Sequence, residues 1–158
     1  IDIIGFIMIL LAGFGWAKPV QINPNNFKNP KRDDILVSVA GPAMNILVAL
    51  VLLTPMRILI SIPIANTAGS TYAILLTILD YAVWINIVLC VFNLLPIPPL
   101  DGSHILFGLT GLKNTEVYFK LYQWSTLILL VLILTRLLGK IIGPPIYFIY
   151  SFLVNLFF

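Results

Sequence analysis

The sequence predicts an all-α protein that lies in a membrane as a polytopic transmembrane helix bundle. Of its 158 residues, 60% are hydrophobic and only 9% are charged. In soluble domains about a quarter of all residues are charged, so a chain this apolar cannot form a polar, water-exposed surface. Several apolar stretches also approach the roughly 20 residues that a helix needs to cross a bilayer. We therefore expect one membrane-embedded domain over residues 1–158, with the lipid bilayer as a partner.

Five stretches are candidate spans. The first, residues 3–16, is short and lacks the basic start of a signal peptide, so we expect the natural chain to continue upstream of Ile1. The others cover residues 35–53, 72–95, 117–138 and 141–158. Asp80 lies near the start of its span, so we expect it at the membrane interface, where an acid costs little free energy.

The most polar part of the chain, residues 18–34, lies between the first two candidate spans. Its prolines, the last of which is Pro30, argue against a regular helix, because proline lacks a backbone donor and clashes with the preceding turn. Val20 and Ile22 alternate with polar neighbours, which favours a short strand. We therefore expect a short irregular or β-hairpin loop near the membrane surface.

The charge balance argues against nucleic acid as a partner. Nine Lys and Arg residues against six acids give a net charge of +3, and no basic run resembles a nucleic-acid patch. In a membrane protein such a balance reflects basic cytoplasmic loops, so we expect no nucleic-acid partner. Cys90 is the only cysteine, which excludes an intrachain disulfide.

The segment from Asn93 to Gly102 reads NLLPIPPLDG and is the most informative in the chain. Its prolines push their preceding residues out of the helical region, so the span before it must end near Leu95. Broken backbone at membrane depth is tolerated only where protein or a water-filled cavity surrounds it. Asp101 then has two open interpretations: a functional intramembrane acid, or the N-cap of a helix that starts at Gly102 or Ser103.

Small and polar residues also share a face on two consecutive spans. Ser38, Gly41 and Asn45 recur at helical spacing on one span, and Asn86 and Asn93 do so on the next. One interpretation is a packing seam for a neighbouring helix. The other is a polar interior between the two helices, since an Asn side chain in lipid must find a hydrogen-bond partner.

His104 follows Asp101 by one helical turn, and two such side chains can hold one metal ion. A catalytic zinc site needs three protein ligands and a water, so this pair alone does not define a site. An interfacial basic residue is the alternative for His104, and both interpretations stay open.

These motifs resemble the signatures of the site-2 protease family. The segment Gly41 to Asn45, which reads GPAMN, is similar to the family's second motif, and NLLPIPPLDG is similar to the third. The polar stretch GWAKPV, with Asn23 and Pro24 after it, resembles the compact prokaryotic branch. The resemblance covers most of the chain. Members of the family are multi-pass zinc metalloproteases that cut transmembrane segments of membrane proteins.

The resemblance implies a role for individual residues. Asp101 takes the place of the third zinc ligand, and Asn45 takes the place of a polar residue that positions the substrate or its oxyanion. Gly41, within the second motif, and Asn93 are expected to contact the substrate, Asn93 because its amide can take over backbone hydrogen bonds of a locally unwound substrate. The cofactor is then zinc, and the partner is a transmembrane protein substrate.

One departure from the family limits this expectation. The family's first motif, His-Glu-x-x-His, supplies two zinc ligands and the general base. The sequence holds a single histidine, His104, and it follows Asp101. We expect the motif upstream of Ile1, so this chain alone, the C-terminal part of a protease core, is expected to be inactive.

The sequence therefore predicts part of an intramembrane zinc endopeptidase in a prokaryotic cell membrane. In the complete protein, zinc would lower the pKa of a bound water and the upstream Glu would take its proton. Two alternatives remain. A transporter or channel would show solute flux without zinc dependence, and a non-catalytic membrane scaffold would keep the bundle and lose the metal.

We predict that residues 18–34 face the cytoplasm. The alternation of the spans also puts Lys113 and Lys120 inside, so six basic residues lie inside against three outside (Arg57, Arg136 and Lys140), as the positive-inside rule favours. A cysteine placed at Asn26 should react with a membrane-impermeant reagent in inside-out vesicles and stay unmodified in right-side-out vesicles. Modification in right-side-out vesicles alone would show that the topology is the opposite one.

Overall fold

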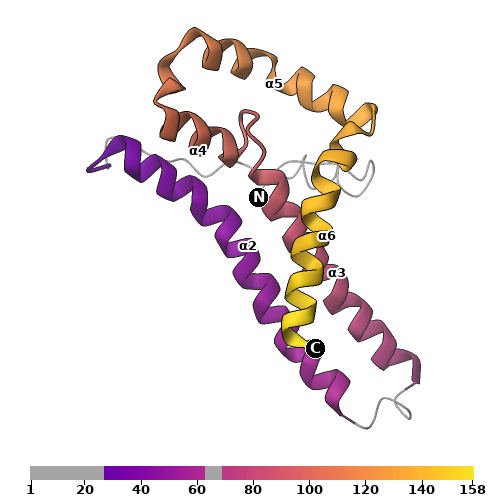
Figure 1. The fold of residues 1–158 in the computed structure, drawn as a ribbon. Coiled ribbons are helices and arrows are strands. Elements are labelled where there is room, and N and C mark those ends of the chain that lie inside the picture. Colours follow the sequence, from indigo (N-terminus) through magenta and orange to yellow (C-terminus); the bar gives the residue numbers. More distant parts are fainter. Residues whose placement is uncertain (1–26, 63–68) are drawn as a thin grey trace, which may run out of the picture. The chain divides into compact units, whose positions relative to one another are not determined.

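A computed structural model describes residues 27–62 and 69–158 of the chain (Figure 1). Every regular element in this part is a helix, which confirms the all-α class. The elements are α2 (Pro30–Ser61), α3 (Gly69–Asn93), α4 (Asp101–Thr110), the 3-10 helix η3 (Leu112–Asn114), α5 (Glu116–Leu134) and α6 (Leu137–Phe157). The candidate span at residues 3–16 and the strand expected near Val20 lie outside the described residues.

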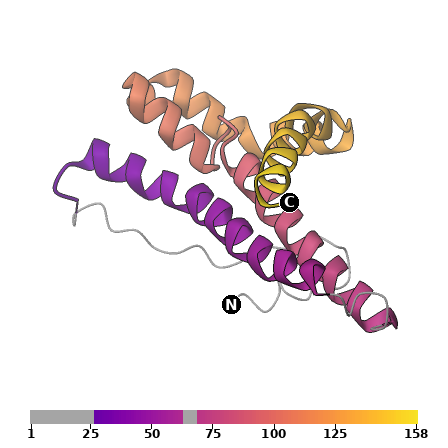
Figure 2. The same cartoon turned by 60° about the horizontal axis from the view of Figure 1, so that its bottom comes forward.

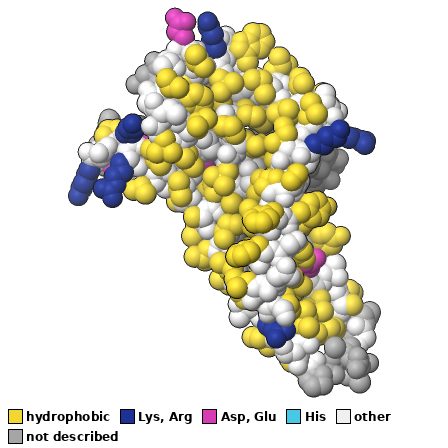
Figure 3. Space-filling model, in the orientation of Figure 1, with side chains coloured by type: hydrophobic (Ala, Val, Ile, Leu, Met, Phe, Trp, Pro, Cys, Tyr) yellow, Lys and Arg dark blue, Asp and Glu magenta, His cyan; other side chains and the backbone are white. Residues whose placement is uncertain are grey.

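Four of these helices, α2, α3, α5 and α6, are long and apolar enough to cross a membrane. Even α5, with 19 residues, extends about 29 Å at 1.5 Å per residue, which matches the hydrocarbon core. Leu134 and Phe148 are each 73% exposed, as expected where lipid is the solvent. Figure 3 shows hydrophobic side chains over much of the visible surface, with Lys and Arg at its extremities. The chain is therefore a multi-pass membrane protein.

Helix α2 begins earlier and ends later than the sequence predicted. We expected residues up to 34 to be non-helical because of Pro30, but Pro30 is the first helical residue. That position has no intrahelical N–H bond to lose, so proline is favoured there. The helix also continues past the expected end at residue 53, with Pro55 inside it. In apolar surroundings a helix satisfies the remaining backbone groups, so one missing hydrogen bond does not end it.

The core of the bundle lies between α2, α3 and α6 (Figure 1). Figure 2 shows the same helices with α6 seen nearly end-on. Its buried residues are aliphatic: Ala49 and Leu53 of α2, Val83, Ile87 and Val91 of α3, and Ile146 and Leu153 of α6. Helix α5 instead packs on α4 through an edge-to-face contact of Phe107 with Tyr118, whose ring centroids are 5.0 Å apart. The three-helix core supports α3. This helix leads directly into residues 94–100, which we call the proline-rich break.

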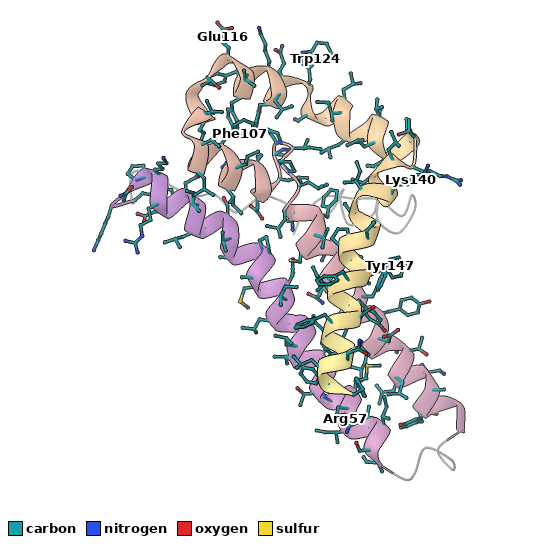
Figure 4. All side chains as sticks on the ribbon, in the orientation of Figure 1. Arg57, Phe107, Glu116, Trp124, Lys140 and Tyr147 are labelled. Atoms are coloured by element: carbon teal, nitrogen blue, oxygen red, sulfur yellow. The ribbon has the colours of Figure 1, made fainter. Side chains whose placement is uncertain are left out.

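Asp80 lies near the middle of α3, inside the span and not at its end. The Tyr150 hydroxyl of α6 donates a hydrogen bond to its Oδ1 over 2.6 Å. Trp84, one turn further on, makes edge-to-face contacts with Tyr150 and Tyr147, with centroids 5.3 and 5.1 Å apart. Tyr147 is labelled on α6 in Figure 4. The interfacial placement expected for Asp80 was therefore wrong, because a partner on another helix makes an interior acid tolerable.

We predict that Tyr150→Phe lowers the stability of the detergent-solubilised complete protein by about 1.5–3 kcal/mol, because the Asp80 carboxylate loses its hydrogen-bond donor. Thermal or denaturant unfolding measures the effect. Tyr147→Phe is the matched control, since the Tyr147 ring, which is 63% exposed, also contacts Trp84. Equal stability of the two variants would show that the Tyr150 hydrogen bond contributes nothing.

Candidate functional site

The proline-rich break follows the end of α3 at Asn93, close to the predicted end near Leu95. The Leu95 N–H donates to the Phe92 carbonyl over 3.1 Å, which tightens the last turn. The chain then passes through turns, and Pro98 within them is fully buried. The break is thus only partly covered by protein, because Leu94, Pro96 and Pro99 are exposed.

Gly102 places the first turn of α4 directly against the end of α3. A Cβ atom added at Gly102 would collide with the Leu94 carbonyl and would lie 2.6 Å from the Leu95 carbonyl oxygen. Both obstacles are backbone and cannot rotate away, so only glycine fits. The Ser103 side chain, which is fully buried, also bonds this turn to the loop by donating to the Leu100 carbonyl over 2.7 Å.

Asp101 is the first residue of α4 and does not cap it. The N-cap position belongs to Leu100, which is extended at φ −71° and ψ 150°, and no side chain makes a capping hydrogen bond there. The capping interpretation of Asp101 was therefore wrong. Its side chain lies instead against α2, where Oδ2 is 3.1 Å from the position of a Cβ added at Gly41.

The Asp101 carboxyl is half-buried, and this burial raises its pKa above the ordinary value, while the nearby charge of His104 acts in the opposite direction. Burial has this effect because it disfavours the charged form. A carboxylate with lost hydration gains more from a bound cation than one in water. A cation held next to Asp101 would therefore offset part of the cost of this burial.

The structure places two of the other predicted site residues, Gly41 and Asn45, near Asp101. Gly41 and Asn45 are one turn apart on α2, so their Cβ positions are about 5–6 Å apart. Adding the 3.1 Å from Gly41 to Asp101 Oδ2 places the Asn45 Cβ within roughly 9 Å of that carboxylate. Asn45 is half-buried, as is Asn93 at the end of α3. Their contacts with a substrate stay predictions.

His104 is engaged away from Asp101. Its Nδ1 lies 3.2 Å from the Lys113 ammonium and 3.4 Å from Asp34 Oδ1, and the Lys113 ammonium donates to Asp34 Oδ2 over 2.6 Å. Sequence reasoning missed Asp34 and Lys113 in this cluster. They lie 79 positions apart, so no local spacing relates them.

The described residues do not form a complete metal site by themselves. Among them, no three His, Cys, Asp or Glu side chains come close enough to hold a metal ion. Catalytic zinc takes three protein ligands, and Asp101 fits the place of one, as an acid at a break in the chain that no capping bond engages. A complete zinc site therefore needs ligands in addition to these residues.

The profile of peptidase family M50, the site-2 proteases, matches residues 56–135, about half of the chain. The matched region contains Asn93, the proline-rich break and Asp101. The chain belongs to this family, as its motifs indicated.

Two relatives of the chain carry informative names. It is 34% identical over 148 residues to the "Putative zinc metalloprotease YwhC" of Bacillus subtilis, which covers 91% of the chain and 65% of that protein. It is 26% identical over 146 residues to the "Putative zinc metalloprotease Rip2" of Mycolicibacterium smegmatis, with 92% and 53% covered. The chain thus spans less than two thirds of the length of these relatives. No solved structure matches it.

We predict that Gly102→Ala destabilises the complete protein by about 1–3 kcal/mol, because the new methyl group must displace backbone. Gly143→Ala is the control, since a Cβ there meets nothing within 4 Å and alanine favours a helix. Thermal unfolding of both variants in detergent measures the difference. If Gly102→Ala unfolded at the same temperature as Gly143→Ala, the close approach to α3 would be refuted.

Proposed function

We propose that the complete protein is an intramembrane zinc endopeptidase and that Asp101 is one of its zinc ligands. The observation that carries the proposal is the Asp101 carboxylate, which makes no capping bond and lies against Gly41. Membership of peptidase family M50 and the zinc metalloprotease names of both relatives support the same assignment. The remaining ligands and the general base belong to the His-Glu-x-x-His motif of the complete protein.

Zinc, when bound, supplies a Lewis acid and lowers the pKa of a coordinated water. Asp101 contributes a negative charge that holds the metal, and its position on α4 sets the direction of that bond. Gly41 leaves space beside the carboxylate, because any side chain at that position would press on Oδ2 at 3.1 Å. The Asn45 amide is one turn away and can donate to a substrate carbonyl.

The surroundings of this site support a proposal for the substrate class. A transmembrane helix keeps its carbonyl groups in intrahelical hydrogen bonds, so it must unwind locally before a peptide bond is exposed. Asn45 and Asn93 are half-buried amides that can replace the lost backbone bonds. We infer that the substrate is a transmembrane protein segment, unwound next to Gly41.

We predict that Asp101→Asn in the complete protein abolishes both zinc retention and cleavage, because a neutral amide oxygen is a poor zinc ligand of nearly the same shape. Metal analysis of purified protein and cleavage of a panel of co-expressed single-span reporters measure the two effects. Glu116→Gln is the matched control, because the Glu116 side chain is 90% exposed.

Near-normal zinc content and cleavage in Asp101→Asn would contradict the assignment of Asp101. Solute flux without zinc dependence in the wild-type protein would favour a transporter or channel. A wild-type protein with neither zinc nor flux would favour a scaffold.

A further inference from the structure

Three polar side chains join the start of α2 to α4 and η3. Asp34 uses both carboxylate oxygens: Oδ2 accepts from the Lys113 ammonium over 2.6 Å, and Oδ1 lies 3.4 Å from His104 Nδ1. The same imidazole nitrogen lies 3.2 Å from the Lys113 ammonium. All three side chains are partly buried, at 23%, 29% and 35% exposure for Asp34, His104 and Lys113. We call this group the polar clamp.

The polar clamp lies on the same pair of helices as Asp101. His104 follows Asp101 by about one turn of α4, and Asp34 precedes Gly41 by about two turns of α2. A Cβ added at Gly108 would be 2.9 Å from Ile35 Cγ1, so the far end of α4 also approaches the start of α2. Helix α4 therefore runs antiparallel to this part of α2, with Asp101 at one end and the polar clamp toward the other.

One contact alone leaves the direction of α4 undefined. Gly102 holds its first turn against Leu94 and Leu95, but a helix of 10 residues can still rotate about that point. Such a rotation would swing the Asp101 carboxylate away from Gly41. The approach of Gly108 to Ile35 restricts this rotation by an apolar contact, and the polar clamp adds a directional attachment between α2, α4 and η3.

We propose that Asp34, His104 and Lys113 are positioning residues that hold Asp101 in the place where it ligates zinc. This inference rests on the proposed function. Groups that orient a metal ligand contribute to metal affinity although they do not touch the metal. The short Lys113 to Asp34 contact is charge-assisted and directional, and it holds η3, which directly follows α4 and packs on it, to α2.

An ordinary exposed ion pair is the alternative, and the chain contains one for comparison. Lys120 lies 3.6 Å from Glu116 on α5, with exposures of 75% and 90%. Exposed pairs of this kind contribute little, because water and salt screen them. The polar clamp differs in its burial, its shorter distance and its use of three residues from three elements.

The test measures zinc affinity of the complete protein in lipid nanodiscs by competition with a chelator. We expect Lys113→Gln to weaken zinc binding about 10-fold, and Lys120→Gln to leave it unchanged. Lys113→Arg keeps the charge and should restore most of the affinity. For a reporter that the wild-type protein cleaves, Lys113→Gln should lower kcat with little change in KM, and added zinc should recover part of the loss.

Wild-type zinc affinity in Lys113→Gln, or an equal loss in Lys113→Arg and Lys113→Gln, would overturn the proposal. Hydrogen exchange at residues 105–110 separates it from the proposed function. If the wild-type protein bound no zinc, the proposed function would fail. Faster exchange in Lys113→Gln would still support the attachment of α4 to α2, and unchanged exchange would overturn it.

Discussion

The arrangement of the site depends on the contact between the backbone of Gly102 and the carbonyl groups of Leu94 and Leu95. That contact sets where α4 begins, and the side chain one position earlier is Asp101. Any side chain at residue 102 would move the carboxylate from its place beside Gly41. A single missing Cβ thus couples the end of α3 to the position of the candidate metal ligand, and this explains why Gly follows Asp at the end of NLLPIPPLDG.

Lipid as a solvent accounts for the rest of the architecture. Apolar side chains cover the outside, so the helices cannot be sorted by an apolar face and a polar face as in a soluble protein. Packing and polar contacts decide instead which faces meet. The aliphatic core between α2, α3 and α6 is one such contact, and the hydrogen bond from Tyr150 to Asp80 is another.

The features that depend on local chemistry were predictable from the sequence. The four described spans follow from hydropathy, and the end of α3 follows from the prolines after Leu95. The start of α2 was missed because Pro30 breaks a helix interior but suits a first turn. The partners of Asp80 and Asp34 were missed for a different reason. They depend on which helices pack together, and the local sequence around a residue does not predict that.

The length of α2 has a consequence for where the site lies relative to the lipid. Its 32 residues extend about 48 Å, whereas the hydrocarbon core is about 30 Å thick. A tilt of up to about 40° does not absorb this mismatch, so part of α2 must project beyond the hydrocarbon. Four charged residues, Lys31, Arg32, Asp33 and Asp34, lie at its first end, against Arg57 alone near the other, so the first end projects at the lower cost. If that end projects, Gly41, about 10 Å further along the helix than Asp34, lies near the boundary between headgroups and acyl chains, where water reaches the protein more readily than at the bilayer centre.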